Sequence, residues 1–396
     1  MRSPESRVHP LGEDLGGAFT YTYPMLYTSI IAQEGIKERL RRQIVTGRIP
    51  HAQLFSGPEG CGKLPMALAF AEALLCQSPV NGNPCGECRS CKMMKRFEHP
   101  DLHFLFPYAH KDNEITTTTH QRTWKEELCR SPYLDSKRWY AAIGAENKLP
   151  IINVKDAAYM SEMLSLTSQQ GGYRVVIIWH AETINEQAAN KILKILEEPP
   201  TKTVIILITE TPERLLTTIT SRTQATEFPA LKDIEIQQAL VQHHGMAEEM
   251  ALTIARSANG SYTQAVNLIQ ANEETAIFFD LFVQLMRKCY MRDIKEMLKW
   301  SELVAEWGRE KQKNFLHYCQ HMVRENFIFN FHEPDLNYLA ANERDFSTRF
   351  SPFINERNVI GIMEELSLAE RDILQNVNPK IVFFDFALKM IVLLIK

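Results

Sequence analysis

The chain has 396 residues, enough for two or three domains, and 45% of them are hydrophobic, which is ample for a packed core. Its 44 Lys and Arg against 48 Asp and Glu give a net charge of −4, which excludes nucleic-acid binding through overall positive charge. No apolar run approaches the roughly 18 residues of a membrane span and no apolar signal core begins the chain. We therefore expect a cytoplasmic protein whose cysteines are reduced thiols or metal ligands and not disulfides.

Residues 1–24 are rich in Gly, Pro, Ser and charged residues and follow neither a helical nor a strand period. We therefore expect either a disordered tail or a start codon assigned too early, with Met25 as the true first residue. Further along, apolar residues at helical spacing predict a helix between Ile36 and Ile44. Residues 52–55, which are apolar except for Gln53, predict a short buried strand after it.

A glycine-rich stretch follows that strand. The residues from Gly57 to Leu64, GPEGCGKL, match the phosphate-loop pattern G-x-x-x-x-G-K and lie before a predicted helix. In a working loop, backbone N–H groups and the Lys hold phosphates, and a following Ser or Thr holds Mg²⁺. Leu64 has no oxygen for a cation. Gly57, Gly60, Gly62 and Lys63 are candidate phosphate contacts, and the alternative that the loop is only a turn stays open.

Four cysteines, Cys76, Cys85, Cys88 and Cys91, follow in the pattern C-x8-C-x2-C-x2-C. Two C-x2-C steps let thiolates converge on one tetrahedral ion, and four thiolates leave no open coordination position. The pattern therefore predicts a structural Zn²⁺ site. A ferredoxin-like run would place a further Cys and a Pro just after Cys91, and position 95 is Lys. Iron–sulfur binding and unligated thiols remain the alternatives.

Residues 107–150 have no clear period and contain a run of threonines, which is typical of an insertion. The next two predicted strands, 174–179 and 203–208, are apolar runs rich in β-branched residues, as in a parallel sheet covered on both faces. A helix between them ends at a Pro-Pro pair. This alternation predicts a three-layer α/β domain that ends near Phe228.

The predicted strand 174–179 runs into Trp179 and His180. A phosphate-loop ATPase has an Asp here that holds Mg²⁺, and an indole cannot replace it. Glu182, three residues beyond Trp179, is a poor substitute. Together with Leu64, this is the second loss at a metal-holding position. We therefore expect no ATP hydrolysis, while the binding of nucleotide stays open.

The rest of the chain has helical patterns without a strand pair or a second glycine-rich site. We therefore divide the chain into the tail, an α/β core over residues 25–229 with the cysteine module at 76–91, a small helical domain over 230–275, and an all-α domain over 276–396.

Five stretches together resemble the bacterial clamp-loader AAA+ subunits of DNA polymerase III. They are HAQLFSGPEGCGK (51–63), LLCQ…CGECRSC (74–91), HPD (99–101), NKILKILEEPP (190–200) and TSR (220–222). The resemblance covers roughly residues 27–230. It implies an AAA+ (RecA-like) parallel-sheet core with a zinc module, a helical lid over 230–275, and a collar for oligomerisation over 276–396.

Departures from the family pattern indicate which kind of subunit this is. The gamma/tau motor subunits carry Thr or Ser after the phosphate-loop Lys, an Asp-Glu pair after the second strand, and an Arg in a Gly-Ser-x-Arg stretch of the lid. Here Leu64, Trp179-His180 and Thr263 stand at those places. The resemblance implies a subunit without ATPase activity of its own, within a DNA-directed DNA polymerase holoenzyme, which is a nucleotidyltransferase.

Ser221-Arg222 remains from the ATPase elements of the family. In this family the pair supplies an arginine finger to ATP bound by a neighbouring subunit, where a guanidinium neutralises charge that develops on the γ-phosphate. From its local residues alone, Arg222 is a surface Arg that ends a helix. The resemblance predicts a finger that acts in trans. The family usually has Cys after this pair, and this chain has Thr223.

The resemblance also implies partners: gamma/tau ATPase subunits, a delta subunit, a sliding clamp reached indirectly, and primed DNA within a hetero-oligomer. Two other functions stay open. One is an active AAA+ motor whose metal site is completed by unusual residues, which turnover that is lost on Lys63→Ala would indicate. The other is a zinc-stabilised DNA-binding module without ring partners, which salt-sensitive DNA binding by the monomer would indicate.

Overall fold

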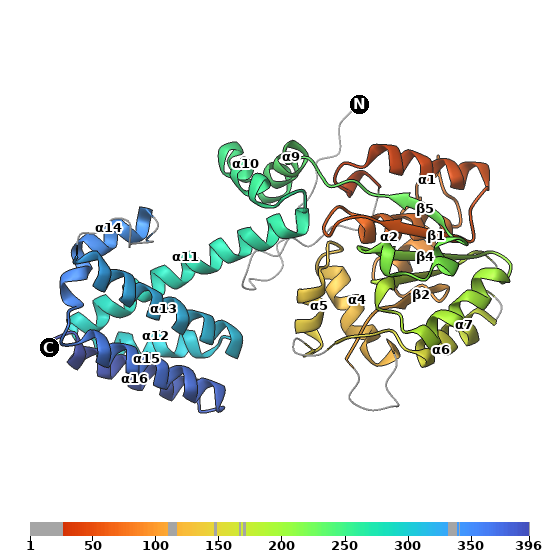
Figure 1. The fold of residues 1–396 in the computed structure, drawn as a ribbon. Coiled ribbons are helices and arrows are strands. Elements are labelled where there is room, and N and C mark those ends of the chain that lie inside the picture. Colours follow the sequence, from red (N-terminus) through yellow and green to blue (C-terminus); the bar gives the residue numbers. More distant parts are fainter. Residues whose placement is uncertain are drawn as a thin grey trace. The chain divides into compact units, whose positions relative to one another are not determined.

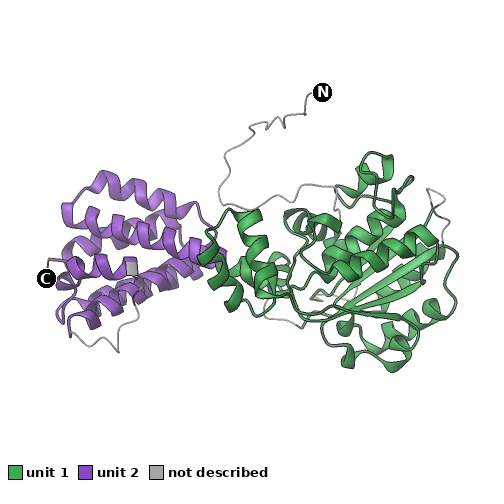
Figure 2. Cartoon of the chain, turned by 90° about the horizontal axis from the view of Figure 1, so that it is seen from above, with its two compact units in different colours: residues 1–268 green, residues 269–396 purple. Residues whose placement is uncertain are grey.

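The structure is a computed structural model. It describes residues 27–109, 117–145, 149–165, 168, 172–331, 339 and 341–395. The predicted tail and the proposed start at Met25 lie outside the described residues, as does part of the predicted insertion. The chain divides into two compact units, residues 1–268 and 269–396 (Figure 2). Among the described helices, none is both long and apolar enough to cross a membrane.

A five-stranded parallel sheet forms the centre of the first unit. Its strands are β1 (Ala52–Ser56), β2 (Leu102–Leu105), β3 (Arg174–Trp179), β4 (Thr203–Thr209) and β5 (Gln224–Glu227), in the spatial order β2-β3-β4-β1-β5. Leu207 of β4 lies opposite Leu54 on one side and Ile178 on the other. Because all strands run parallel, their carboxyl ends meet at one edge of the sheet.

The first unit contains further helices, of which all but the last two pack on this sheet, and the last two pack against each other. In chain order, the helices are α1 (Glu34–Thr46), α2 (Lys63–Leu75), α3 (Arg89–Met94), α4 (Gln121–Arg130), α5 (Ser136–Ala142), α6 (Val154–Ser165), α7 (Glu186–Glu197), α8 (Thr217–Thr220), α9 (Asp233–His244) and α10 (Glu248–Ser257). The short 3-10 turns are η1 (Tyr27–Ser29), η2 (Thr117–His120), η3 (Ala181–Thr183) and η4 (Pro212–Arg214).

Helices cover both faces of the sheet (Figure 1). Successive residues of a strand point to opposite faces. Val175 and Ile177 of β3 therefore join a core with α1 to α5, whereas Val176 and Ile178 join a second core with α6 and α7. The predicted three-layer α/β class is confirmed, and the glycine-rich loop follows β1 as an AAA+-like core requires.

Sequence signals at both ends define α7. The side chain of Asn185 accepts a hydrogen bond from the backbone N–H of Ala188 at 2.8 Å and so caps the first turn. Ile192 and Leu196 bury the inner face of the helix. The Pro-Pro pair after Glu198 stops it, as predicted, which leaves Glu197 exposed in the last turn.

The second unit is entirely helical over its described residues. It contains the end of α11 (Tyr262–Met291), then α12 (Ile294–Ala305), α13 (Arg309–Phe329), α14 (Ala341–Phe350), the turn η6 (Ser351–Phe353), α15 (Val359–Leu374) and α16 (Pro379–Leu393). Its core is rich in aromatic side chains, among them Phe282, Trp300, Phe315 and Phe383. The predicted all-α C-terminal region is confirmed for these residues.

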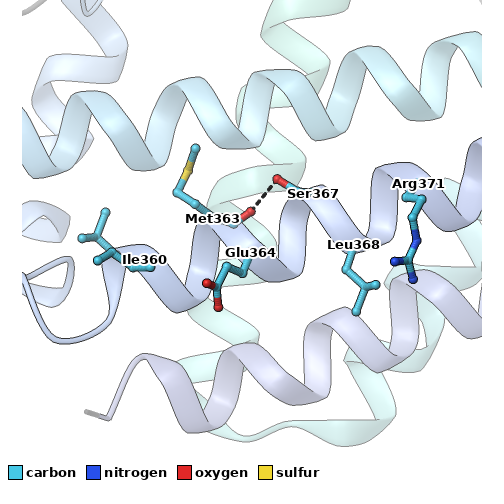
Figure 3. A pocket seen from close by; sticks show the side chains of 7 residues that line it. Ile360, Met363, Glu364, Ser367, Leu368 and Arg371 are labelled. Atoms are coloured by element: carbon cyan, nitrogen blue, oxygen red, sulfur yellow. Dashed lines mark hydrogen bonds between the residues drawn. The ribbon is translucent and has the colours of Figure 1, made fainter.

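The outer face of α15 is hollowed (Figure 3). Ile360, Met363 and Leu368 line a hollow of about 560 Å³ together with Glu364. Ser367 also lines the hollow, and its hydroxyl donates to the backbone carbonyl of Met363 at 2.8 Å. The second unit therefore buries its own core and still presents apolar side chains outward.

Candidate functional site

The predicted phosphate loop lies between β1 and α2, at the carboxyl edge of the sheet. Gly57, Gly60 and Gly62 all have positive φ angles of 144°, 72° and 99°, which side chains rarely adopt. Lys63 begins α2 and is buried, and its ammonium donates to the carbonyl of Gly57 at 2.7 Å and to that of Pro58. The lysine thus binds its own loop.

Leu64 follows the loop lysine, where a working loop has a cation-binding hydroxyl. Its side chain is buried in the core shared with α1 to α5. The start of α11 also covers the glycine loop: the N–H of Tyr262 donates to the carbonyl of Gly60 at 3.2 Å. A Cβ on Gly60 would lie 2.0 Å from Oγ of Ser261, so the start of α11 lies directly on the loop.

Tyr133 closes the same space from another side. Its ring lies 4.9 Å from that of Tyr262, centroid to centroid, and its hydroxyl accepts the N–H of Ile31 at 3.0 Å. Gln33 donates to the carbonyls of Cys61 and Pro229 at 3.1 and 2.9 Å. Three separate segments therefore pack on the glycine loop within the first unit.

The loop also lies in an acidic surrounding. Burial, followed by the negative charges of Glu210 and Asp135, raises the pKa of Glu59 in the loop, although His180 and Lys63 act in the opposite direction. Carboxylates this close to the loop disfavour a polyanion such as a triphosphate.

Trp179 and His180 stand where a Mg²⁺-holding carboxylate is expected. Trp179 is 4% exposed and belongs to the core, while His180 adopts a left-handed backbone conformation with φ of 51°. The ring Nδ1 of His180 lies 2.9 Å from Oε1 of Glu182. Burial alone would raise the pKa of Glu182, but its hydrogen bond with His180 and the charge of that ring hold the pKa below its usual range.

The side chain of Trp124, which packs on Trp179, comes from residues 107–150. Trp124 of α4 lies 5.1 Å from Trp179 between ring centroids and stacks on Phe106 at 4.5 Å. Trp139 of α5 meets Trp124 edge to face at 5.0 Å. The sequence indicated no period here, yet the described part of this segment folds into two helices that build an aromatic cluster at the sheet edge.

The four predicted cysteines do come together. Their sulfur atoms all lie within 4.8 Å of one another, with Cys76 and Cys88 3.9 Å apart and Cys85 and Cys91 4.0 Å apart. An ion bound tetrahedrally at about 2.3 Å from each sulfur would separate the sulfurs by about 3.8 Å. The cluster therefore fits a metal ion such as zinc.

The chain's own backbone prepares this cluster. Cys76 follows the last residue of α2, Cys88 caps α3, and Cys91 lies in the first turn of α3. The N–H groups of Cys85, Cys88 and Cys91 point at the sulfurs of Cys76, Cys85 and Cys88 at 3.3, 3.4 and 3.4 Å. Such N–H donors stabilise thiolates, which are the form that binds a metal.

The thiols of the cluster differ in how their surroundings shift the pKa. Backbone N–H groups of Glu87 and Cys88 lower the pKa of Cys85 to about 6, whereas burial raises those of Cys76 and Cys91. Four thiolates in contact repel one another, so a divalent cation is what such a donor set needs.

The cluster and the phosphate loop are separate sites. Gly62 precedes α2 and Cys76 follows it, so the two lie at opposite ends of a helix of 13 residues, about 20 Å apart.

Arg222 follows α8 and is partly exposed, with 38% of its side chain accessible. Its Nη1 donates to the carbonyl of Thr218 at 3.0 Å, and its Nη2 lies 2.8 Å from Oε1 of Glu197. Neither the acid at the end of α7 nor the two tyrosines over the loop were singled out from the sequence. The sequence signal for Glu197 was limited to its place in the Glu-Glu-Pro-Pro stretch that ends α7.

Comparison with known proteins gives one family. A family model described as "DNA polymerase III, delta subunit" matches residues 32–232. DNA polymerase III subunit delta' of Bacillus subtilis (strain 168) is 30% identical over 243 residues, 61% of this chain and 60% of the relative. The delta' subunit of Pseudomonas aeruginosa is 36% identical over 172 residues, 43% and 41% of the two chains. The tau subunit of Escherichia coli (strain K12) is 27% identical over 251 residues, 62% and 32% of the two chains. Each match thus spans less than two thirds of the relative.

Proposed function

The chain belongs to the DNA polymerase III delta-subunit family, and we propose that it serves as the delta-prime subunit of a clamp loader and hydrolyses no ATP itself. Its proposed partners are gamma/tau ATPase subunits and a delta subunit, in a hetero-oligomer that loads a sliding clamp onto primed DNA. In this assembly Arg222 reaches ATP bound by the neighbouring gamma/tau subunit and neutralises charge that develops on the γ-phosphate.

This proposal rests on a contrast between the phosphate loop and the surroundings of Arg222. On one side, Lys63 is buried and donates to its own loop, and Trp179 fills the position of a Mg²⁺ ligand with a packed indole. On the other side, Arg222 lies at the surface, where a second chain can reach it. A subunit that supplies an arginine to the ATP site of its neighbour needs an accessible Arg222 and needs no working nucleotide site of its own.

We also propose that the glycine loop binds no nucleotide. A triphosphate would have to displace the Tyr262 N–H from Gly60 and separate Tyr133 from Tyr262. It would meet the carboxylates of Glu59 and Glu210 as it entered. A single lysine that already has carbonyl partners offsets little of this repulsion.

For the cysteine module we propose a structural Zn²⁺ held by Cys76, Cys85, Cys88 and Cys91. When bound, the ion supplies the positive charge that keeps four thiolates together. The cysteines themselves tie the end of α2 to the start of α3, so the module fixes the turn between these helices. Four protein ligands leave no place for a reacting water.

The second unit supports the assembly part of the proposal. Besides the hollow along α15, it exposes large apolar side chains on α16, where Ile381 and Val392 are 63% and 59% accessible. Exposed apolar patches of this kind are typical of surfaces that bind another protein. We assign this helical unit to contact with the collar helices of the other loader subunits.

The test begins with the isolated chain. We expect neither ATP turnover nor ATP binding, for the wild type and for Lys63→Ala alike, and we expect the wild type to raise ATP turnover when it is added to gamma/tau and delta subunits. Phosphate release and fluorescent-nucleotide titration measure both. Turnover by the isolated chain that is lost in Lys63→Ala would instead establish an active motor subunit.

A further inference from the structure

Arg222 has a partner within its own chain. Nη2 of its guanidinium lies 2.8 Å from Oε1 of Glu197, in the last turn of α7. Nη1 donates to the backbone carbonyl of Thr218 in α8 at 3.0 Å. The two contacts come from different helices, so they fix both the position and the plane of the guanidinium.

The end of α7 attracts a cation for two reasons. The carboxylate of Glu197 carries a full negative charge, and the C-terminal carbonyls of a helix add a partial negative charge in the same place. Glu198, the next residue, forms no ion pair with any residue that the structure describes. Of these two acids at the end of α7, Glu197 is therefore the one that pairs with the guanidinium.

We propose that Glu197 is the resting partner of Arg222, a positioning residue that retains the guanidinium against α7 until a phosphate of a neighbouring subunit replaces it. This inference rests on the proposed function of Arg222 in trans. It adds that Arg222 is not freely available in the uncomplexed chain, because Glu197 competes with the γ-phosphate for it.

The strength of the pair suits such an exchange. Both side chains are partly exposed, 38% for Arg222 and 50% for Glu197, and ion pairs in contact with water are weak. A γ-phosphate with its three oxygens carries more negative charge and forms stronger hydrogen bonds with a guanidinium than one carboxylate does. Only Nη2 has to change partner, since the contact of Nη1 with Thr218 is to the chain's own backbone.

The test compares Glu197→Gln with Glu198→Gln in a reconstituted loader, without clamp and DNA. Glu197→Gln keeps the size of the side chain and removes its charge, so we expect basal ATP turnover to rise about two- to fivefold. Glu198→Gln changes the net charge equally and should leave basal turnover as it is. Circular dichroism and gel filtration establish that each variant folds and assembles.

The same change in an Arg222→Ala background separates positioning from a general structural effect. Because Glu197 acts through Arg222, we expect Glu197→Gln to change nothing once Arg222 is absent. If Arg222→Ala lowers turnover but Glu197→Gln behaves like Glu198→Gln, the resting-partner role is wrong and the function of Arg222 stands. If Arg222→Ala itself changes nothing, both are wrong.

Discussion

The ring centroid of Trp124 in α4 lies 5.1 Å from that of Trp179 at the end of β3. One residue comes from a segment that carries no helical period in the sequence, and the other stands where a Mg²⁺ ligand is expected. The indole that stands in place of the metal ligand is therefore held in a packed aromatic cluster, and this segment builds that cluster.

Placing metal-binding residues at the two metal-holding positions, 64 and 179, should not create an ATPase. We expect Trp179→Asp to lower the free energy of unfolding of the first unit by about 3–5 kcal/mol, because it removes a packed indole and buries a carboxylate. The double variant Leu64→Thr/Trp179→Asp should show no ATP turnover. Denaturant unfolding and phosphate release measure these effects.

Trp179→Phe is the control for this prediction, since it keeps an aromatic ring and should lose a smaller part of the stability. Turnover by the double variant at unchanged stability would mean that the cluster does not exclude the metal site.

The contact between the glycine loop and α11 predicts a difference between two Gly→Ala variants. A Cβ on Gly60 would meet Oγ of Ser261 at 2.0 Å, whereas nothing lies within 4 Å of a Cβ on Gly47. Both glycines have similar positive φ angles, 72° and 66°. Gly47→Ala should cost about 1–2 kcal/mol for the backbone alone, and Gly60→Ala about 1–3 kcal/mol more.

Urea unfolding measures both variants, and hydrogen exchange at the amide of Tyr262 reports the contact itself. Equal losses of stability in the two variants would show that α11 does not press on the loop.

Much of the first unit could be predicted from the sequence because its signals are local. The bounds of β3 agree with the apolar run 174–179, α7 stops at the Pro-Pro pair, and the four cysteines meet as their spacing indicated. The family resemblance, drawn from short motifs, is confirmed by the matching family model and relatives.

What escaped prediction depends on contacts between distant residues. Tyr133 and Tyr262 meet over the glycine loop although 129 positions separate them, and no local pattern marks either one. The edge strands β2 and β5 have four residues each, too few for a period. The domain boundary at residues 275/276 stays a prediction, and α11 continues through it.

Metal removal should affect the fold and not a reaction. We expect about one zinc per chain in the purified protein and its loss in Cys91→Ala, together with a fall in stability of about 2 kcal/mol or more, which is roughly 4–8 °C in Tm. Metal analysis and thermal unfolding measure the two effects. Cys129→Ala, outside the cluster, should retain the metal. Iron with sulfide, or a stable metal-free protein, would contradict the zinc assignment.

The His180–Glu182 pair predicts a dependence of stability on pH. Because the pKa of Glu182 in the folded chain lies below its ordinary value of 4.5, its contribution is present above that pH and is lost as pH falls through the folded pKa. The difference in unfolding free energy between wild type and Glu182→Gln should therefore shrink on acidification.

Urea unfolding from neutral pH down to about pH 3.5 measures this difference. Glu213→Gln, at an exposed position, should give no such trend. A difference that is independent of pH would mean that the pair does not hold the carboxylate in its charged form.

The most direct test of the account is ATP turnover at the motor site beside this chain, in a loader with clamp and primed DNA whose other motor sites are silenced. Arg222→Ala is compared with Arg122→Ala, which removes another exposed Arg paired with a Glu, at 2.9 Å from Glu126. With assembly intact, we predict a loss of about 10³-fold for Arg222→Ala and none for Arg122→Ala. Equal turnover in both variants would contradict the account and leave the chain a scaffold.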